Sequence, residues 1–285
     1  MGPELRIGAS SWTAPSWEGV FYPRPSRPAE WLPYYAARHD TVEIDATFYR
    51  TPEARTVDGW RDRTPGGFLF AAKVPQVITH EKVLEDCAPE LNAFLKVMDR
   101  LGDRLGPLLF QFRYFSKAEL PDPKPFLDRL ERFLMGLPHD GRRFALEVRN
   151  KTLVTDRFLD LLTRHRVALA WIDHPWFHRV DALLQRPRAL TADFVYVRWL
   201  GDRKGIEAKT TTWDRLILDR SAEMRRWVPA IRGMIGGGRS VFGYFNNHYA
   251  GYAIGSIAAF REMWEATGAP VPAAPAGGVA PPAGP

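Results

Sequence analysis

The feature that most constrains the fold is an alternation between short apolar runs and longer segments whose apolar residues recur every three or four positions. The apolar runs are Leu5–Ala9, Val42–Ala46, Phe68–Val74, Leu108–Phe112, Phe144–Val148, Val167–Ile172, Phe194–Arg198 and Val241–Phe245. The segments with helical spacing are Ala29–Arg38, Glu53–Asp62, Pro89–Leu101, Pro123–Met135, Asp156–Arg164, Phe177–Ala192 (where the pattern is weak), Arg220–Arg232 and His248–Ala266. The pattern predicts eight strands, each followed by a helix.

Strands that alternate with helices form a parallel sheet, because each crossover returns the chain to the same end of the sheet. Eight such units are the number that closes a (β/α)₈ barrel, so we predict an α/β protein of the TIM-barrel class. The alternative is a doubly wound open sheet. Its commonest version carries Gly-x-Gly-x-x-Gly after the first strand, and no such motif follows Leu5–Ala9.

The connections differ in length according to their direction. Those from helix to strand are short, and several from strand to helix are long: Ser11–Pro28, Pro75–Ala88, Arg113–Asp122 and Trp199–Asp219. Long loops on one face predict a binding or catalytic site at the C-terminal ends of the strands. Only Ala, Pro, Gly and Val occur over 269–285, so we expect one barrel domain over 1–268 and a disordered tail over 269–285.

Composition narrows the protein class further. The formal charge is +6, with the basic residues spread along the chain. A spread excess of this size is usually an ordinary solvated surface, and the alternative is an anionic partner, either a small molecule or a nucleic acid. Cys87 is the single cysteine, so no internal disulfide can form. No apolar run reaches the ~18 residues of a membrane span, and the N-terminus lacks a signal-peptide pattern. We expect a cytoplasmic protein without a membrane partner.

Strand side chains alternate between the barrel interior and the helix layer. On the second strand Val42 and Ile44 suit the helix layer, so Glu43 and Asp45 should point inward. The same test directs charged or polar groups inward near the ends of other strands: Lys73, Gln111, Glu147, Arg149, Asp173, Arg198 and Asn246. Buried charges are costly unless they are paired. Such groups either form internal ion pairs, such as Glu43 with Lys73 or Glu147 with Arg149, or build a ligand site.

Two other chemistries are open at this point. Carboxylates with His80, His174, His178 and His248 could ligate a divalent metal, although no tight ligand spacing favours one. Glu43 and Glu147 could act as the carboxylate pair of a carbohydrate-active hydrolase, with loop tryptophans for sugar stacking. Cofactor use therefore stays undefined.

The end of the eighth strand offers a second kind of anion site. Asn246 and Asn247 precede the last helix, where backbone N–H groups can bind phosphate, and the basic loop 201–205 is predicted beside them. Asn247 could equally be a helix cap. The glycine triplet 236–238 precedes a strand and therefore lies on the opposite face, as a turn.

Nucleic-acid binding without catalysis is the main alternative to an enzyme. Aromatic and basic residues are interleaved in the first two strand-to-helix loops and could stack on and neutralise a single strand: Trp12, Tyr22, Arg24, Arg27, Tyr49 and Arg50. The same residues also suit a small-molecule pocket.

Several motifs identify a relative. They are IGASSW at 7–12, WEGVFYP at 17–23, VEIDATFYR at 42–50, FLFAAK at 68–73 with ITH at 78–80, EVR at 147–149, YVR at 196–198 and YFNN at 244–247. Together they make the chain similar to the YecE-like family of domains of unknown function (DUF72) over residues 5–266. The resemblance implies a barrel but no particular reaction.

The chain departs from the family pattern after three strands. Where the family tends to have histidine after the positions of Arg149 and Arg198, this chain has Asn150 and Leu200, and Arg113-Tyr114 replaces a proline pair. We therefore assign candidate hydrolase or isomerase chemistry to carboxylates. The catalytic candidates are Glu43, Asp45, Lys73 and Glu147. The ligand-binding candidates are Trp12, Tyr49, His80, Gln111, Arg149, Asp173, Arg198, Asn246 and Asn247.

Overall fold

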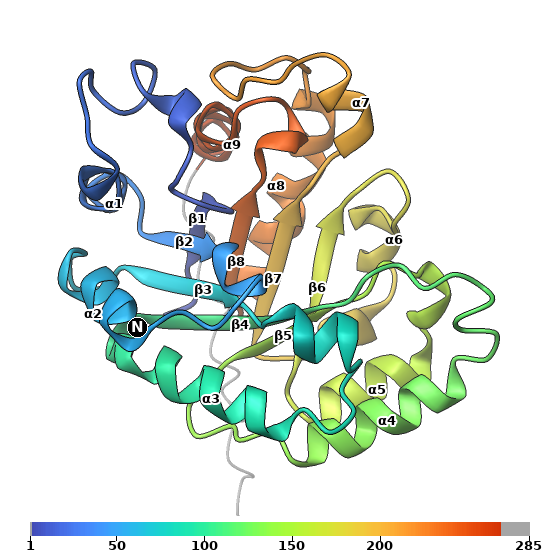
Figure 1. Ribbon diagram of the computed structural model, residues 1–285. Coiled ribbons are helices and arrows are strands. Elements are labelled where there is room, and N and C mark those ends of the chain that lie inside the picture. Colours follow the sequence, from blue (N-terminus) through green and yellow to red (C-terminus); the bar gives the residue numbers. More distant parts are fainter. Residues whose placement is uncertain (1, 269–285) are drawn as a thin grey trace, which may run out of the picture.

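The computed structural model describes residues 2–268 as eight parallel strands surrounded by helices (Figure 1). The strands are β1 (Leu5–Ala9), β2 (Thr41–Ile44), β3 (Leu69–Lys73), β4 (Leu105–Gln111), β5 (Phe144–Glu147), β6 (Ala168–Asp173), β7 (Phe194–Trp199) and β8 (Ser240–Phe245). The helices are α1 (Pro28–Ala36), α2 (Ala54–Asp62), α3 (Ala88–Met98), α4 (Lys124–Met135), α5 (Asp156–Arg164), α6 (Val180–Leu184), α7 (Arg203–Glu207), α8 (Ser221–Gly236) and α9 (Ala253–Ala266). The predicted (β/α)₈ barrel is confirmed.

The barrel closes at a seam between β1 and β2. Hydrogen-bonded neighbours run β1-β8-β7-β6-β5-β4-β3-β2, and within the described residues no ladder joins the two end strands. The hydroxyl of Tyr35 in α1 lies in this seam, where it accepts from the N–H of Ala9 (2.7 Å) and donates to the carbonyl of Thr41 (3.1 Å). The backbones approach so closely that a Cβ on Gly8 would lie 2.1 Å from the Thr41 carbonyl oxygen. A side-chain hydroxyl thus supplies hydrogen bonds that a ladder would otherwise make.

The barrel interior is packed with small side chains on one side and large ones on the other. Strands β3, β5 and β6 contribute alanines, whereas β7 and β8 contribute aromatic rings: Ala71, Ala145, Ala168, Ala170, Phe194, Tyr196, Phe242 and Tyr244. Small alanine side chains leave room for the large rings on the opposite side, so the two sets pack together in the interior. Val42 and Ile44 belong to a separate core shared with the helices, as strand parity predicts.

Three connections differ from the sequence-based expectation. The last helix begins at Ala253, well after His248, because Gly251 has a φ of +105° and a short 3₁₀ turn, Asn247–Tyr249, precedes it. The loop after β7 contains the short helix α7, and the weak pattern after β6 yields only α6 and a 3₁₀ turn. All three differences fall in long loops, where tertiary contacts decide the conformation and local sequence patterns predict it poorly.

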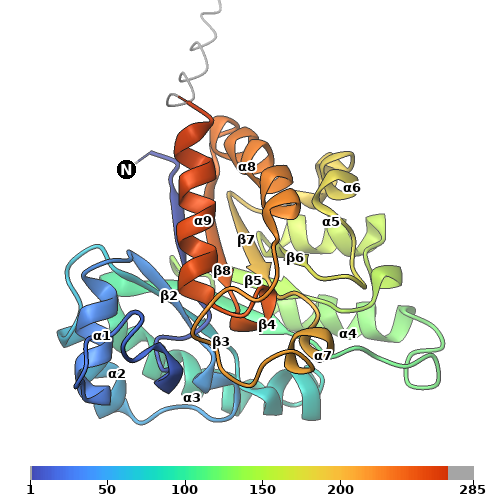
Figure 2. The ribbon, with the colours of Figure 1, turned by 90° about the horizontal axis from the view of Figure 1, so that it is seen from above.

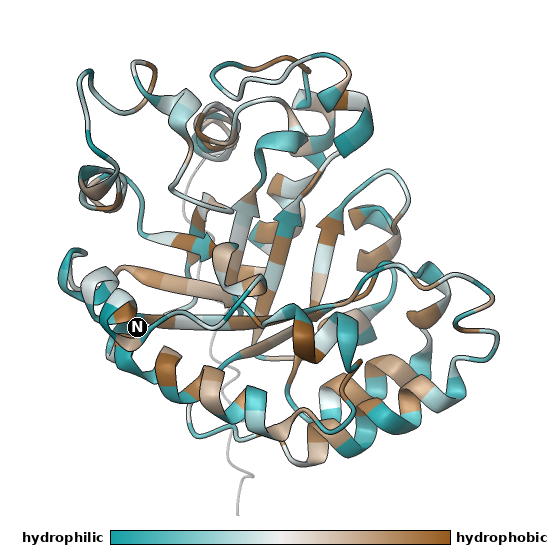
Figure 3. Cartoon of the chain, viewed as in Figure 1, coloured by the Kyte–Doolittle hydropathy of each residue, from teal (hydrophilic) through white to brown (hydrophobic). Residues whose placement is uncertain are grey.

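The long loops gather at one end of the barrel, where Figure 2 shows α7 beyond the strand ends while α8 and α9 run alongside the strands. Figure 3 shows apolar colours on the strands and hydrophilic colours over much of these loops. The glycine triplet lies at the other end, as predicted, where Gly238 has a φ of +85°. The predicted tail over 269–285 lies outside the described residues. No helix within residues 2–268 has the length and apolar character needed to cross a membrane.

Candidate functional site

The charged side chains inside the barrel form one network around Arg198 of β7. Its two terminal nitrogens bond separately to Glu43 of β2 and Glu147 of β5, each at 2.8 Å. Tyr196 donates its hydroxyl to the other oxygen of Glu43 at 2.6 Å. The second oxygen of Glu147 lies 2.6 Å from Nε of Arg149. Both glutamate side chains are completely buried, so this network lies inside the barrel, below the solvent-accessible mouth.

The network keeps Glu147 and Arg198 charged. Burial by itself raises the pKa of Glu147, but the guanidinium groups of Arg149 and Arg198 outweigh burial and lower it below its usual value. Burial by itself lowers the pKa of Arg198, but Glu43 and Glu147 raise it well above the ordinary arginine value. Charges that are this deeply buried are tolerated because each has a hydrogen-bonded partner of opposite sign.

A second ion pair lies nearer to solvent. Lys73 of β3 donates to Asp45 at 2.9 Å and lies 4.2 Å from the ring centroid of Phe48. The expected partner of Lys73 was Glu43, but β2 ends at Ile44 and turns into a 3₁₀ segment, which places Asp45 over the lysine. The side chain of Asp45 is 38% exposed. Asp45 is thus the accessible carboxylate among the four catalytic candidates.

His80 lies in an unusual stretch of backbone after β3. It belongs to a π-helical turn, Val77–Glu81, which is followed by positive φ angles at Val83, Leu84 and Asp86. Burial, then Lys73 and Arg113, lower the pKa of His80 to about 4, so its imidazole is neutral at pH 7. Single π-helical turns and strained backbone occur frequently at functional sites. The geometry keeps His80 among the binding candidates.

Other candidates from the sequence have structural partners instead. Trp12 is buried edge-on against Trp60 and Phe70, with ring centroids 5.6 and 6.1 Å away. Asn246 accepts the N–H of His248 at 2.9 Å, and Asn247 accepts the N–H of Ala253, the first residue of α9, at 2.9 Å. The interpretation of Asn247 as the N-cap of the last helix is wrong, since Tyr252 occupies the N-cap position of α9, but the Asn247 side chain still accepts the first N–H of that helix. Tyr49, by contrast, is exposed.

A pocket of about 830 Å³ opens at the mouth over the ends of β4, β5 and β6. It is lined by Gln111, Arg113, Tyr114, Arg149, Asn150, Lys151, Thr152, Ile172, His174, Trp176 and Phe177. Gln111 and Arg149 are sequence-based candidates that the structure brings together here. The lining has three cationic side chains and no carboxylate. Its volume is within the range of about 300–1,000 Å³ typical of small-molecule sites.

The cations of this pocket differ in how far they are neutralised. Arg113 pairs with Glu119 at 2.7 Å, and Arg149 pairs with Glu147. Lys151 is exposed, and within residues 2–268 no carboxylate lies within ion-pair distance of it. Trp176 is 75% exposed at the rim. The pocket therefore offers an anion a free ammonium group beside two guanidinium groups, and offers a flat ring a stacking surface.

Sequence reasoning did not select Arg113 or Lys151, and it considered Trp176 only as one of the loop tryptophans that suit sugar stacking. They lie in loops just beyond the strands, where the alternation of inward and outward side chains no longer applies. The available signal was their position, since Arg113 follows the inward Gln111 by two residues and Lys151 follows Arg149 by two.

Metal ligation has a limited structural basis in this part of the chain. Within residues 2–268, no group of three or more His, Cys, Asp or Glu side chains is placed to hold one metal ion. The sequence-based candidates Glu43 and Glu147 are instead engaged by guanidinium groups.

The fold and the site together define a (β/α)₈-barrel protein with a cationic pocket at the C-terminal ends of its strands. The chain belongs to the family described as "Protein of unknown function DUF72", whose model matches residues 6–278. This confirms the YecE-like resemblance drawn from the motifs, since the two names denote the same family.

Solved structures agree with this assignment. A DUF72 family protein from Thermotoga maritima is 24% identical over 92% of this chain and 99% of that chain, with a TM-score of 0.71. One from Enterococcus faecalis V583 is 21% identical over 92% and 98%, with a TM-score of 0.65. The D-psicose 3-epimerase of Clostridium cellulolyticum H10, solved with D-tagatose, is 12% identical over 93% and 96%, with a TM-score of 0.50. At these identities the likeness concerns the fold alone. No curated protein sequence matches the chain.

Proposed function

We propose that this chain binds a phosphate-bearing ligand with a flat ring, such as a nucleotide, in the mouth pocket. The observation that carries the proposal is the charge of the lining: Arg113, Arg149 and Lys151 face the pocket and no carboxylate does. Phosphate oxygens accept charge-assisted hydrogen bonds from such groups, and arginine suits them because of its planar fork of donors. A neutral sugar has no negative charge with which these three cations could pair.

Each part of the pocket has a role in this proposal. Glu147 holds Arg149 from below, so this guanidinium is fixed in position before the ligand arrives. Lys151 supplies the charge that the protein leaves uncompensated. Trp176 at the rim stacks on the ring, an interaction worth ~1–3 kcal/mol for a nucleic-acid base. Orientation by Arg149 and attraction by Lys151 are thus separate contributions to affinity.

Single-stranded nucleic acid is a second candidate, which rests on the distribution of exposed rings. Tyr49 after β2 and Tyr114 after β4 are 68% and 64% exposed, and they follow strands whose ends lie at the same mouth as Trp176. Several stacking surfaces on separate loops suit an extended strand with more than one base. A mononucleotide would need only the pocket.

Catalysis belongs to the proposal as hydrolysis or isomerisation of the bound ligand. Because Glu43 and Glu147 are buried and both bond to Arg198, we assign them the role of positioning residues. Asp45 with Lys73 and the neutral His80 are then the acid–base candidates at the mouth. A glycosidase pair would need substrate between its carboxylates, and Arg198 occupies that position between Glu43 and Glu147.

The test is a titration with adenosine monophosphate and with a short single-stranded oligonucleotide over a salt series. We expect saturable binding that weakens at least tenfold in the double variant Arg113→Ala/Lys151→Ala. Lys96→Ala, an exposed lysine on α3, is the matched control and should leave the Kd unchanged. Absence of binding of both probes at low salt contradicts the proposal. A stronger salt dependence for the oligonucleotide than for the mononucleotide favours the strand as ligand.

A further inference from the structure

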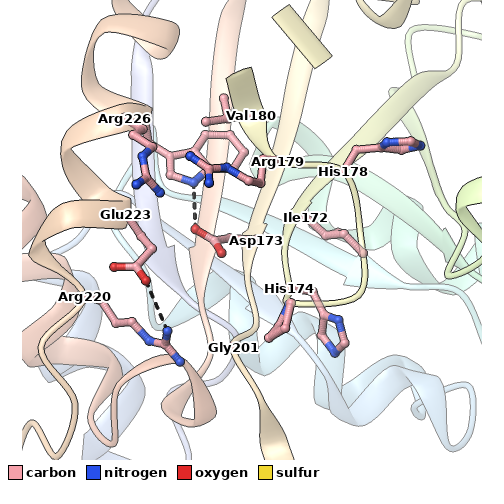
Figure 4. Close-up of a pocket in the computed structure, with 12 residues that line it drawn as sticks. Ile172, Asp173, His174, His178, Arg179, Val180, Gly201, Arg220, Glu223 and Arg226 are labelled. Carbon is pink, nitrogen blue, oxygen red and sulfur yellow. Dashed lines mark hydrogen bonds and ion pairs between the residues drawn. The ribbon is translucent and has the colours of Figure 1, made fainter. Parts of the chain in front are cut away.

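A second cavity lies beside the mouth pocket, between the end of β6, the segment leading to α6, and the first turns of α8. Its volume is about 270 Å³, and its lining includes Asp173, Arg179, Arg220, Glu223, Arg226 and Trp227. It adjoins the mouth pocket where Ile172 and His174 line both. Figure 4 shows Arg220, Glu223 and Arg226 on the α8 side, His174 and His178 on the other side, and Asp173 between them. Its size suits a ligand smaller than a nucleotide.

Asp173, the last residue of β6, is held on one side only. Its Oδ2 accepts from the indole N–H of Trp227 at 2.8 Å and from the hydroxyl of Tyr249 at 3.3 Å. Burial raises the pKa of this carboxyl in spite of both donors. Within residues 2–268 no basic side chain forms an ion pair with it, and its Oδ1 has no hydrogen bond from this part of the chain. One carboxyl oxygen is thus fixed and the other is left for a ligand.

The three arginines around Asp173 are unequally paired. Arg220 lies 3.4 Å from Glu223 and donates to the carbonyl of Tyr249, while Arg179 pairs with Asp181 at 2.9 Å. Arg226 has no carboxylate within ion-pair distance in the described part of the chain. The cavity therefore has one guanidinium group whose charge the protein does not compensate.

We propose that this cavity binds a small hydroxylated anion, of the class of a phosphorylated three-carbon polyol. The anionic group lies against Arg226 and Arg179, and a ligand hydroxyl donates to the free oxygen of Asp173. A carboxyl beside arginines would disfavour a bare anion, so the hydroxyl is the feature that makes the site selective. The inference depends on this cavity alone and does not require the mouth pocket to bind a nucleotide.

The experiment is a calorimetric titration of the full chain with glycerol 3-phosphate, inorganic phosphate and glycerol at low ionic strength. We expect glycerol 3-phosphate to bind at least tenfold more tightly than phosphate, and glycerol not to bind. Arg226→Ala should weaken glycerol 3-phosphate binding at least tenfold. Arg225→Ala removes the neighbouring exposed arginine of α8, which does not line the cavity, and should leave the Kd within twofold. Asp173→Asn should reduce the preference for glycerol 3-phosphate over phosphate.

Three results would overturn the proposal. The first is no heat of binding from glycerol 3-phosphate at millimolar concentration. The second is an equal loss in Arg226→Ala and Arg225→Ala, which assigns the effect to general surface charge. The third is a loss in Lys151→Ala as large as that in Arg226→Ala, which places the ligand in the mouth pocket. Because Lys151 lines only the mouth pocket, failure here and failure of nucleotide binding are separate results.

Discussion

The interior network around Arg198 and the mouth pocket above it are both built from charged residues, but they differ in access and in charge balance. Inside the barrel, Glu43 and Glu147 are fully buried and Arg198 bridges them. At the mouth, Lys151 is exposed, and within residues 2–268 it has no carboxylate partner. The interior charges are therefore already satisfied by the protein, whereas the mouth leaves a positive charge for a ligand to satisfy.

The difference separates two kinds of polar residue in a barrel. A charge on a strand, pointing inward, must find a partner within the protein because burial without one is expensive. A charged side chain one or two residues later, in the loop, stays hydrated. It therefore needs no partner within the protein and is available to a ligand. Arg149 is the link between the two regions, since it contacts Glu147 and also lines the pocket.

The largest expected effect comes from breaking the interior network. Arg198→Met leaves Glu43 and Glu147 buried without their shared partner, so we expect the free energy of unfolding to fall by about 3–5 kcal/mol. Chemical denaturation at pH 7 measures this, with the exposed Arg188→Met on the outer surface as control. A decrease in the free energy of unfolding of less than about 1 kcal/mol would show that solvent reaches the network. The interior charges would then not differ in access from the charges at the mouth.

Two tryptophans, one buried and one exposed, differ in the same way as the interior network and the mouth pocket. Trp12→Ala removes a ring packed against Trp60 and Phe70, and we expect it to destabilise the fold by about 3–5 kcal/mol.

Trp176→Ala removes an exposed ring, so the free energy of unfolding should change by less than about 0.5 kcal/mol while nucleotide affinity falls by ~1–3 kcal/mol. Denaturation and titration of both variants check this. Unchanged affinity in Trp176→Ala would remove the stacking surface from the proposal.

The smallest expected effect is a pH dependence from Glu147. Its pKa is lowered in the folded protein relative to about 4.3 in the unfolded chain, so its contribution to stability is present above pH ~4.3. That contribution is lost as the pH falls through the folded value. Glu147→Gln does not titrate, so its Tm deficit relative to the wild type should shrink as the pH falls below about 4.3. A deficit that is constant from pH 7 to pH 3 would contradict the lowered pKa.

The fold could be predicted from the sequence because strand and helix periods are local. Parity also directed Glu43 and Glu147 inward, but it could not show that Arg198, far along the chain, bridges them. The pairing of Lys73 with Asp45 depends on where β2 ends, which the residues alone did not reveal. The loop residues Lys151 and Trp176 carry no periodic signal, so the sequence could place them beyond the strand ends but could not show that both line one pocket.

Ligands are expected to contact the loop cations and to leave the interior network intact. The most direct measurement is a crystal structure of the full chain soaked with adenosine monophosphate. We expect phosphate density within hydrogen-bond distance of Arg149 and Lys151, with Arg198 still bonded to both Glu43 and Glu147. Density that displaces Arg198 from either glutamate, with substrate against the freed carboxylate, would contradict it.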